Sequence, residues 1–389
     1  MLKYLAGLAA GGLALLPLNV AAASPAWELW HPIKGVMDLG GPRTDGNLLV
    51  AGSAALYLVG ADGTEAAFAR GPGGYREDPG TEAYAVTSPG GEVAAAGCSF
   101  TRDDTFLLRL HVPMGITRVS ASGEETGAFN NLTGVIGLNG IVFDTGGAFD
   151  HRLLVTGAAS GKTVVFAIDC NGAVSVVTRS APQLEGGLAI APPSFGAFGG
   201  DLIAPDENTG KIYAIAPDGK VGTIAKPALP VGGDAGVESL GFVPEGLIAR
   251  GGAAYFADRM TANSPHSGSD SILRLTSSEL AAAGVQEGDL LAATEGGGQM
   301  VAIRCQAKCT VTPVVATATK AHGEGHIVFT VTPPPPTPSA APVANTSRPA
   351  ISPGLVDFVG TWGVPLGVGV LVLVLLAGAG VTALRRRAR

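Results

Sequence analysis

Short runs of apolar residues, separated by polar turns, recur along most of the chain. In residues 201–220, the apolar run 202–204 leads into a polar turn that ends at Gly210, and a second run, 212–216, stops at Asp218-Gly219. Branched and aromatic side chains suit a pleated sheet, and Asp-Gly suits a tight hairpin turn. The pattern of this stretch therefore predicts two antiparallel strands joined by a hairpin.

The first of these two runs has counterparts at intervals of 43 to 60 residues. They are residues 47–52, 92–97, 152–157, 201–204, 246–249 and 289–292. A repeat of about 40 to 50 residues with several short strands is typical of the blades of a β-propeller. The pattern therefore predicts an all-β fold, a propeller with six blades in which each copy is the second strand of one blade.

The fifth repeat is irregular and leaves five or seven blades as alternatives. A run at 254–259 competes with 246–249 for the second strand, and a polar loop at 261–269 follows it. Residues 276–279 then form a capping box, which starts a short helix that Gly284 ends. We interpret these features as insertions in one blade, so six blades remain the prediction.

The first 23 residues have the pattern of a secretory signal peptide. Lys3 precedes an apolar run at 4–18, and Ala21-Ala22-Ala23 matches the small-residue pattern of a cleavage site. An uncleaved membrane anchor is the alternative, but the apolar run is short for a span. We therefore expect residues 24–331 to form an exported body.

The C-terminal region has the pattern of a stalk and an anchor. Residues 332–363 begin with a proline-rich stretch, which predicts an extended stalk and a juxtamembrane segment because proline cannot donate to a sheet. Residues 364–384 are uncharged and long enough for a transmembrane helix, and the basic tail 385–389 follows them. Basic residues stay in the cytoplasm, so the sequence predicts a single-pass cell-membrane protein with its body outside.

The charge of the body excludes one class of partner. The chain has 25 basic and 32 acidic residues, and five of the basic ones lie in the signal and the tail, which leaves 20 against 32. Nucleic acid binding needs an excess of Lys and Arg, so we expect no nucleic-acid partner. An acidic body is compatible with cation binding and with solubility alone.

A polar residue stands at the beginning of most of the predicted innermost strands. These residues are Glu82, Asn139, Glu185, Glu238 and Glu324. Innermost strands line the axis of a propeller, so we expect these side chains to converge there. Oxygen ligands with net negative charge suit a hard cation, which predicts an axial Ca²⁺ site. The alternative is that these side chains bond to loop backbones or face the solvent, and the pattern alone favours it.

Other polar residues have ordinary interpretations. Asp206, Asp258 and Glu295 end predicted second strands, where acids usually fasten neighbouring blades, although they could add ligands. In 322–326, His322, Glu324 and His326 would share one side of a strand and could hold Zn²⁺, but a polar loop is the simpler interpretation. The chain contains no Gly-x-Ser-x-Gly, His-Glu-x-x-His, phosphate-loop or dinucleotide pattern.

Four cysteines in an exported chain suggest disulfides. Cys305 and Cys309 flank a three-residue turn and could bridge across it. Subtraction then pairs Cys98 with Cys170. Free thiols remain the alternative.

Several stretches resemble a known group of propellers. They are Leu-Asn-Gly-Ile-Val-Phe-Asp at 138–144, Leu-Glu-Gly-Gly-Leu-Ala-Ile at 184–190, Tyr-Phe-Ala-Asp at 255–258 and the Asp-Gly hairpins. Together they resemble the six-bladed propellers of the gluconolactonase and regucalcin-like group, and the NHL-type propellers, over most of residues 30–331. The resemblance implies a divalent metal at the axis, held by a Glu in a Glu-Gly context and an Asn in an Asn-Gly context. Glu185-Gly186 and Asn139-Gly140 match these contexts, but their order and blades differ, and the resemblance does not place the group's catalytic Asp on a particular residue.

Two functions follow as hypotheses. The first is a membrane-anchored module that binds an unknown extracellular ligand or protein. The second is an extracellular Ca²⁺-dependent hydrolase of the lactonase type. The stalk, the anchor and the missing catalytic motif favour the first, and whether the protein is an enzyme stays open.

Overall fold

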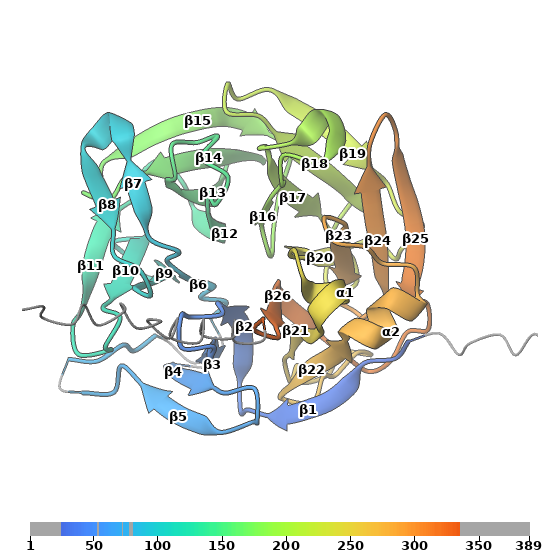
Figure 1. Cartoon of the computed structure of the whole chain (residues 1–389). Helices are drawn as coiled ribbons and strands as arrows, with labels where there is room; N and C mark the ends of the chain where they lie inside the picture. Colours follow the sequence, from blue (N-terminus) through green and yellow to red (C-terminus); the bar gives the residue numbers. More distant parts are fainter. Residues whose placement is uncertain (1–24, 53, 72, 78–80, 335–389) are drawn as a thin grey trace, which may run out of the picture. The chain divides into compact units, whose positions relative to one another are not determined.

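Six four-stranded antiparallel sheets stand around a common axis, as Figure 1 shows. The computed structural model describes residues 25–52, 54–71, 73–77 and 81–334. The prediction of an all-β propeller with six blades is confirmed. We number the blades 1 to 6 and give the strands of each from the axis outward.

Blades 1 to 4 follow one another along the chain. Blade 1 consists of β2 (Val36–Gly40), β3 (Leu48–Gly52), β4 (Ala55–Val59) and β5 (Glu65–Phe68). Blade 2 consists of β6 (Ala85–Thr87), β9 (Thr105–Arg109), β10 (Gly115–Val119) and β11 (Thr126–Asn131). Blade 3 consists of β12 (Gly137–Phe143), β13 (Leu153–Ala159), β14 (Lys162–Ile168) and β15 (Val174–Ala181). Blade 4 consists of β16 (Ala189–Ile190), β17 (Leu202–Asp206), β18 (Lys211–Ile215) and β19 (Val221–Ala225).

Blades 5 and 6 are interlaced in the sequence. Blade 5 consists of β20 (Val237–Phe242), β23 (Leu290–Thr294), β24 (Met300–Cys305) and β25 (Cys309–Val315). Blade 6 consists of β26 (Gly323–Val331), β21 (Gly252–Asp258), β22 (Ser271–Thr276) and β1 (Glu28–Pro32). The chain therefore leaves blade 5 after its innermost strand, builds the middle of blade 6, and then returns.

This interlacing corrects the interpretation of the fifth repeat. The run at 254–259 belongs to β21 of blade 6 and is no insertion in blade 5, while 246–249 lies in the short helix α1 (Leu247–Arg250). Helix α2 (Ser277–Ala282) begins at the predicted capping box, in which Thr276 and Glu279 bond reciprocally. Sequence adjacency suggested one blade because successive strands usually pair, and here they do not.

The prediction that residues 92–97 form the second strand of a blade is also wrong. Its residues form β7 (Gly91–Val93) and the 3₁₀ helix η1 (Ala94–Ala96), and β7 pairs with β8 (Cys98–Phe100) as a separate hairpin. Three successive alanines favour a helical turn over a strand, and Gly97 ends it in the left-handed conformation at φ 61°. The second strand of blade 2 is β9 instead.

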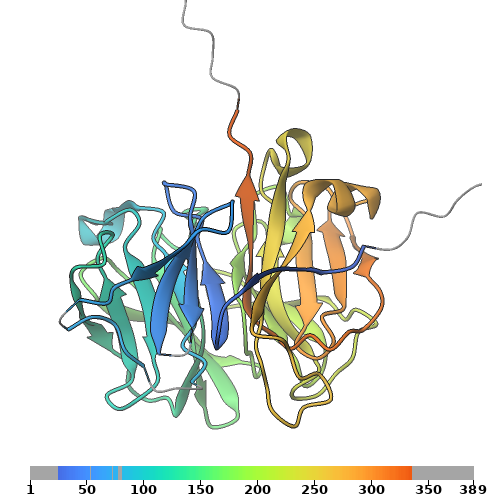
Figure 2. The ribbon, with the colours of Figure 1, turned by 90° about the horizontal axis from the view of Figure 1, so that it is seen from below.

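The ring closes in blade 6, where β1 from the N-terminal side pairs with β22 and β26 from the C-terminal side lines the axis. Trp27, just before β1, donates from its indole nitrogen to the carbonyl of Gly298 at 2.8 Å and packs on Phe256. Figure 2 shows β1 crossing the side of the ring and β26 running along its middle. Both ends of the described chain thus stabilise one blade.

The apolar core lies between neighbouring blades. Between blades 2 and 3, Phe100, Phe106 and Phe143 pack edge to face with ring centroids 5.0 to 5.5 Å apart. Both predicted disulfides are present: Cys98–Cys170 joins the extra hairpin of blade 2 to blade 3, and Cys305–Cys309 closes the turn between β24 and β25.

Nothing in the described part of the chain is a helix long and apolar enough to cross a membrane. The predicted signal peptide (1–23), the transmembrane helix (364–384) and the basic tail (385–389) lie outside the described residues. The same holds for all but the first three residues of the predicted stalk segment 332–363.

Candidate metal centre

The innermost strands bring four of the five predicted glutamate and asparagine residues together at one end of the axis. The hydroxyl of Tyr84 lies 2.6 Å from Oε1 of Glu238 and 3.1 Å from Oε2 of Glu324. Arg259 bridges Oε1 of Glu324, at 2.8 Å, and Oε1 of Glu82, at 2.6 Å. Glu185 is near enough for the charges of Glu82 and Glu295 to act on it. We call these residues and those added below the axial acid cluster.

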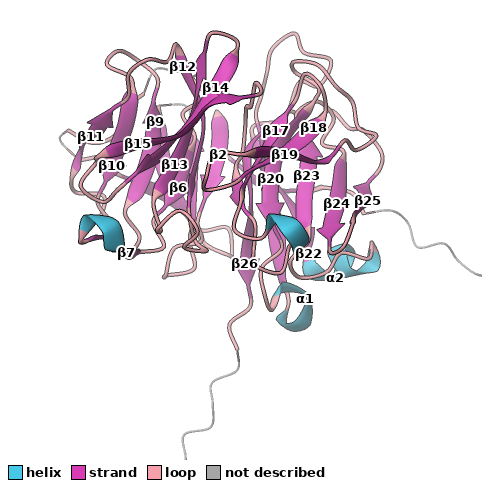
Figure 3. Ribbon diagram, turned by 90° about the horizontal axis from the view of Figure 1, so that it is seen from above, coloured by secondary structure: helices cyan, strands magenta, loops and turns pink. Residues whose placement is uncertain are grey.

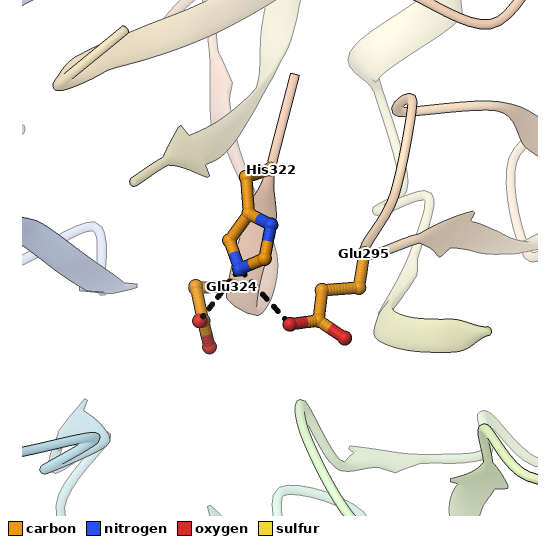
Figure 4. A group of neighbouring side chains, drawn as sticks. All are labelled: Glu295, His322 and Glu324. Atoms are coloured by element: carbon orange, nitrogen blue, oxygen red, sulfur yellow. Dashed lines mark ion pairs between the residues drawn. The ribbon is translucent and has the colours of Figure 1, made fainter. Parts of the chain in front are cut away.

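Three further residues complete this cluster. Nε2 of His322 lies 3.0 Å from Oε1 of Glu295 and 3.6 Å from Oε1 of Glu324, as Figure 4 shows. Glu207 forms a side-chain hydrogen bond with Glu295. Glu295 was predicted as a fastener between blades, and the structure places it in the cluster instead.

Asn139 is not brought into the cluster by any side-chain contact among the described residues. Its carbonyl accepts the N–H of Gly186, and its neighbour Gly140 is tightly packed: a Cβ there would lie 2.9 Å from the carbonyl oxygen of Gly186. Gly186 itself has φ 89°, and a Cβ would lie 2.1 Å from the carbonyl oxygen of Glu238. Close backbone approach therefore explains the glycines of both the Asn-Gly and the Glu-Gly motif.

His326 points away from His322 and Glu324, which corrects the expectation that the three share one side. Gly325 adopts φ 65°, and the register of β26 on β21 shifts at this position, so the alternation of side chains is broken. Nδ1 of His326 lies 3.0 Å from both oxygens of Asp38, and Nε2 lies 2.8 Å from the carbonyl oxygen of Ile141.

The other two strand-end acids are structural. Asp206 accepts hydrogen bonds from the backbone and hydroxyl of Thr209, two positions after Glu207. Asp258 accepts from the backbone of His322 at 2.8 Å and from Ser269. The sequence predicted that these two acids fasten neighbouring blades, but their hydrogen bonds to described residues lie within their own blade.

The crowding of acids raises their pKa values. Burial and then the neighbouring Glu324 raise the pKa of Glu238 well above 4.5. Burial and then Glu82 raise the pKa of Glu324, although Arg259 opposes this. Burial, Glu185 and Glu295 raise the pKa of Glu207 to about 8. The described cluster thus holds more negative groups than it can keep ionised without a further cation.

Two buried atoms of the cluster lack a partner among the described residues. Oε2 of Glu238 accepts no hydrogen bond, although the residue is only 3% exposed. Nδ1 of His322 is also unpartnered in a side chain that is 2% exposed. Buried polar atoms are usually satisfied, so an unpaired carboxylate oxygen here is consistent with a bound water or ion.

The donor atoms fit a metal ion. Ligand atoms of Glu295, His322 and Glu324 all lie within 4.8 Å of one another, and all three residues are buried. An imidazole nitrogen with carboxylate oxygens is a donor set that first-row divalent metals accept, whereas Ca²⁺ takes oxygen. A metal-bound histidine usually donates its second N–H to an acceptor, and Nδ1 of His322 lacks one among the described residues.

Sequence reasoning missed Tyr84, Arg259 and Glu207. Tyr84 and Arg259 each carried a usable signal, because Tyr84 follows Glu82 by two positions and Arg259 directly follows the end of β21. Glu207 follows the end of β17 in the same way. Residues just beyond a strand end were treated as turns, which hid their convergence on the axis.

No protein-family model matches the chain, and no curated protein matches it in sequence. Solved structures that are similar include virginiamycin B lyase from Staphylococcus aureus, at 12% identity and a TM-score of 0.40, over 77% of this chain and 92% of that one. A protein assigned to the gluconolactonase family matches at 10% identity and a TM-score of 0.40, over 78% of this chain and 96% of that one. Such values concern the fold and carry no conclusion about activity. The chain is a six-bladed β-propeller.

Proposed function

We propose that this protein is a ligand-binding propeller that holds a divalent cation in its axial acid cluster and is tethered to the cell membrane from its C-terminal side. The observation that supports the cation is that, among the described residues, six glutamates from four blades converge with one arginine and one histidine. Such a density of buried acids is stable only with protons or a metal ion.

The identity of the cation follows from the donors. Glu295, His322 and Glu324 would hold a first-row ion such as Mn²⁺ or Zn²⁺, with Glu238 supplying an unpaired oxygen on the same axis. Ca²⁺, which the sequence predicted, would have to rely on the carboxylates alone. A bound cation would supply a positive charge that orders the ligand-binding end of the axis.

Calorimetry on the full chain, stripped with a chelator, tests this proposal. We expect one equivalent of Mn²⁺ or Zn²⁺ to bind and to stabilise the fold, by about 2.7 kcal/mol at a hundredfold excess over Kd. Glu295→Gln should weaken binding about tenfold or more, because it removes one charged ligand. Glu245→Gln, an exposed acid outside the cluster, is the matched control and should change nothing.

Failure of Mn²⁺, Zn²⁺ and Ca²⁺ to bind at millimolar concentration would contradict the cation. Equal cation affinities of the Glu295→Gln and Glu245→Gln variants would contradict the location of the cation in the axial acid cluster.

The proposal that the protein is tethered to the membrane rests on the sequence of residues 364–384 and of the basic tail after them. We expect the protein to stay with membranes after washing at high pH, and protease added outside cells to remove the propeller. Release of the full chain by the wash would contradict the anchor.

A metal-dependent hydrolase of the lactonase type is the second candidate, favoured by one observation. The carboxyl of Glu207, half-buried beside Glu295, has a pKa raised to about 8 by burial, Glu185 and Glu295. A group that titrates near neutral pH suits general acid–base catalysis. Glu207 is not one of the proposed metal ligands, so its carboxyl is available to act as the general acid or base.

Hydrolysis of a panel of lactones by the metal-loaded protein separates the two functions. If the second candidate holds, Glu207→Gln should lower the rate at least about a hundredfold while the cation still binds. If no lactone is hydrolysed above the buffer rate with Mn²⁺, Zn²⁺ or Ca²⁺, the hydrolase is excluded and the ligand-binding module remains as the proposed function.

A further inference from the structure

The axis has a second half whose chemistry differs from that of the acid cluster. Each innermost strand passes from the cluster toward the opposite face, and together the six line a cavity of about 530 Å³. Figures 2 and 3 show β26 ending at that face, on which α1 and α2 also lie. We call this cavity the axial funnel.

The walls of the funnel are apolar. Val86, Val142, Ile190, Phe242 and Val328 line it from five different blades. Val142 and Phe242 are only half-buried although they belong to innermost strands, so apolar surface faces the cavity. A cavity of this size with aliphatic and aromatic walls is typical of a small-molecule site, and it offers water few hydrogen-bond partners.

The funnel continues into a groove. A second cavity of about 500 Å³ shares Thr145, Ile190, Phe242 and Pro244 with it. Strands of blades 3, 4 and 5 supply or adjoin these residues, so the two cavities are neighbours.

The ionisable residues of the funnel favour an anion at its rim. Arg102 is exposed, and no ion pair joins it to any other described residue. Arg43 is buried and donates to the carbonyl oxygens of Asp103 and Ala121, at 2.9 and 2.7 Å. Asp103, the one carboxylate that lines the funnel, is already bonded to Thr44. The floor is His326, which Asp38 neutralises.

This charge is opposite to that of the protein as a whole, which is −7. The acids Glu245 and Glu287 line only the groove, where they would disfavour a second anion. Among the described residues, the funnel therefore combines apolar walls with one cation at its mouth that forms no ion pair, which is the chemistry of a site for an amphiphile with one negative head group.

We infer that the axial funnel binds a free single-chain carboxylate amphiphile of the fatty-acid class, with its alkyl chain against Val142 and Phe242 and its carboxylate at Arg102. The site does not require the cation, because no residue that lines the funnel belongs to the acid cluster.

Fluorescence titration of the full chain in nanodiscs with 11-(dansylamino)undecanoate tests the inference, with empty nanodiscs subtracted. We expect saturable binding by the wild type. Val142→Trp, which fills the funnel, should weaken it about tenfold or more. Arg102→Glu should weaken it to a similar extent, because it removes a charge-assisted contact, but should leave binding of the methyl ester unchanged. Arg179→Glu makes the same charge change on the outermost strand of blade 3 and should have no effect.

Absence of saturable binding by the wild type overturns the inference. So does equal binding by Arg102→Glu and Arg179→Glu, a comparison between exposed positions that holds even if Val142→Trp does not fold. Binding of the full chain to anionic vesicles without uptake of the monomeric probe also overturns it. Cation affinity, measured in the same preparations, should be the same in all four proteins, so failure here is distinct from failure of the metal centre.

Discussion

The hydroxyl of Tyr84 has one proton and lies within hydrogen-bond distance of two carboxylates. It can donate to Glu238 or to Glu324 but not fully to both, so without a cation the second carboxylate must itself carry a proton. Burial and the charges of Glu238 and Glu324 raise the pKa of the Tyr84 hydroxyl, so it stays protonated. The metal-free cluster therefore depends on bound protons.

This dependence fixes how stability varies with pH. The pKa values of Glu238, Glu324 and Glu207 are higher in the folded protein than their ordinary value of 4.5. Each group then stabilises the fold fully below its unfolded pKa, and this contribution is lost as the pH rises through the folded pKa. The free energy of unfolding of the metal-free protein should fall above about pH 4.5, and for Glu207 through about pH 8.

Glu238→Gln removes one of these titrations. An amide cannot ionise, and its oxygen can still accept the hydrogen bond that the Tyr84 hydroxyl donates to Glu238. We expect the metal-free variant to be about 1 kcal/mol more stable than the wild type at pH 8, with a shallower pH dependence. Urea unfolding at pH 5, 6.5 and 8 with a chelator measures this, and Glu245→Gln is the control. The same pH dependence in Glu238→Gln and wild type would show that Glu238 does not titrate as inferred.

Residues of the cluster could be predicted only where the repeat placed them. Glu82, Glu185, Glu238 and Glu324 stand at or just before the start of the innermost strands of blades 2, 4, 5 and 6, so their convergence follows from the blade pattern. Glu207 and Arg259 reach the axis from the ends of second strands, and their direction depends on loop conformations that the repeat does not encode. The disulfide Cys98–Cys170 was reached by subtraction, since residues 72 apart give no local signal.

At the scale of elements, β26 serves two sites because its alternation is broken once. Glu324, with His322 just before the strand, belongs to the cluster, whereas His326 joins β26 to β2 through Asp38 and to β12 through Ile141. Burial alone lowers the pKa of His326, but Asp38 outweighs it, so the pKa is raised above 6.5. Nδ1 and Nε2 both face acceptors, which requires the doubly protonated ring. Gly325 allows Glu324 to point into the acid cluster and His326 to point toward Asp38.

Gly325→Ala tests this role. Its φ is 65°, and a Cβ would lie 2.0 Å from Oδ1 of Asp38, so the side chain has no space. We expect a loss of about 3 kcal/mol of unfolding free energy, from backbone strain and overpacking together. Gly127→Ala, where no atom lies within 4 Å of the added Cβ, should be nearly neutral. Thermal and urea unfolding of both variants measures the difference, and equal stability would remove Gly325 from the explanation.

For the whole molecule, the interlacing of blades 5 and 6 predicts a shared opening. Strands β21 and β22 are linked at both ends to strands of blade 5, so neither blade can separate without disturbing the other. In native-state hydrogen exchange, we expect amides of β21, β22, β23 and β24 to open with one common free energy. Distinct opening free energies, with blade 6 well below blade 5, would contradict this coupling. Blade 1, whose strands are consecutive in the sequence, is the internal control, and its amides should open with a free energy of their own.

The blade count was predictable because each blade leaves a similar pattern of apolar runs, whichever order the chain follows. The order was not, because 237–242 and 252–258 are neighbours in sequence yet begin different blades. The blade of each is decided by a distant partner strand: 237–242 pairs with β23, and 252–258 pairs with β26. These partners lie about 50 to 70 residues further along the chain.

Propellers are commonly regarded as modular, since a segment that encodes one blade can be duplicated, lost or exchanged as a unit. Residues 237–331 do not allow this, because any cut between them divides a sheet. Their smallest exchangeable unit is a pair of blades. An engineer who removes a single blade from this ring must therefore choose it among blades 1 to 4.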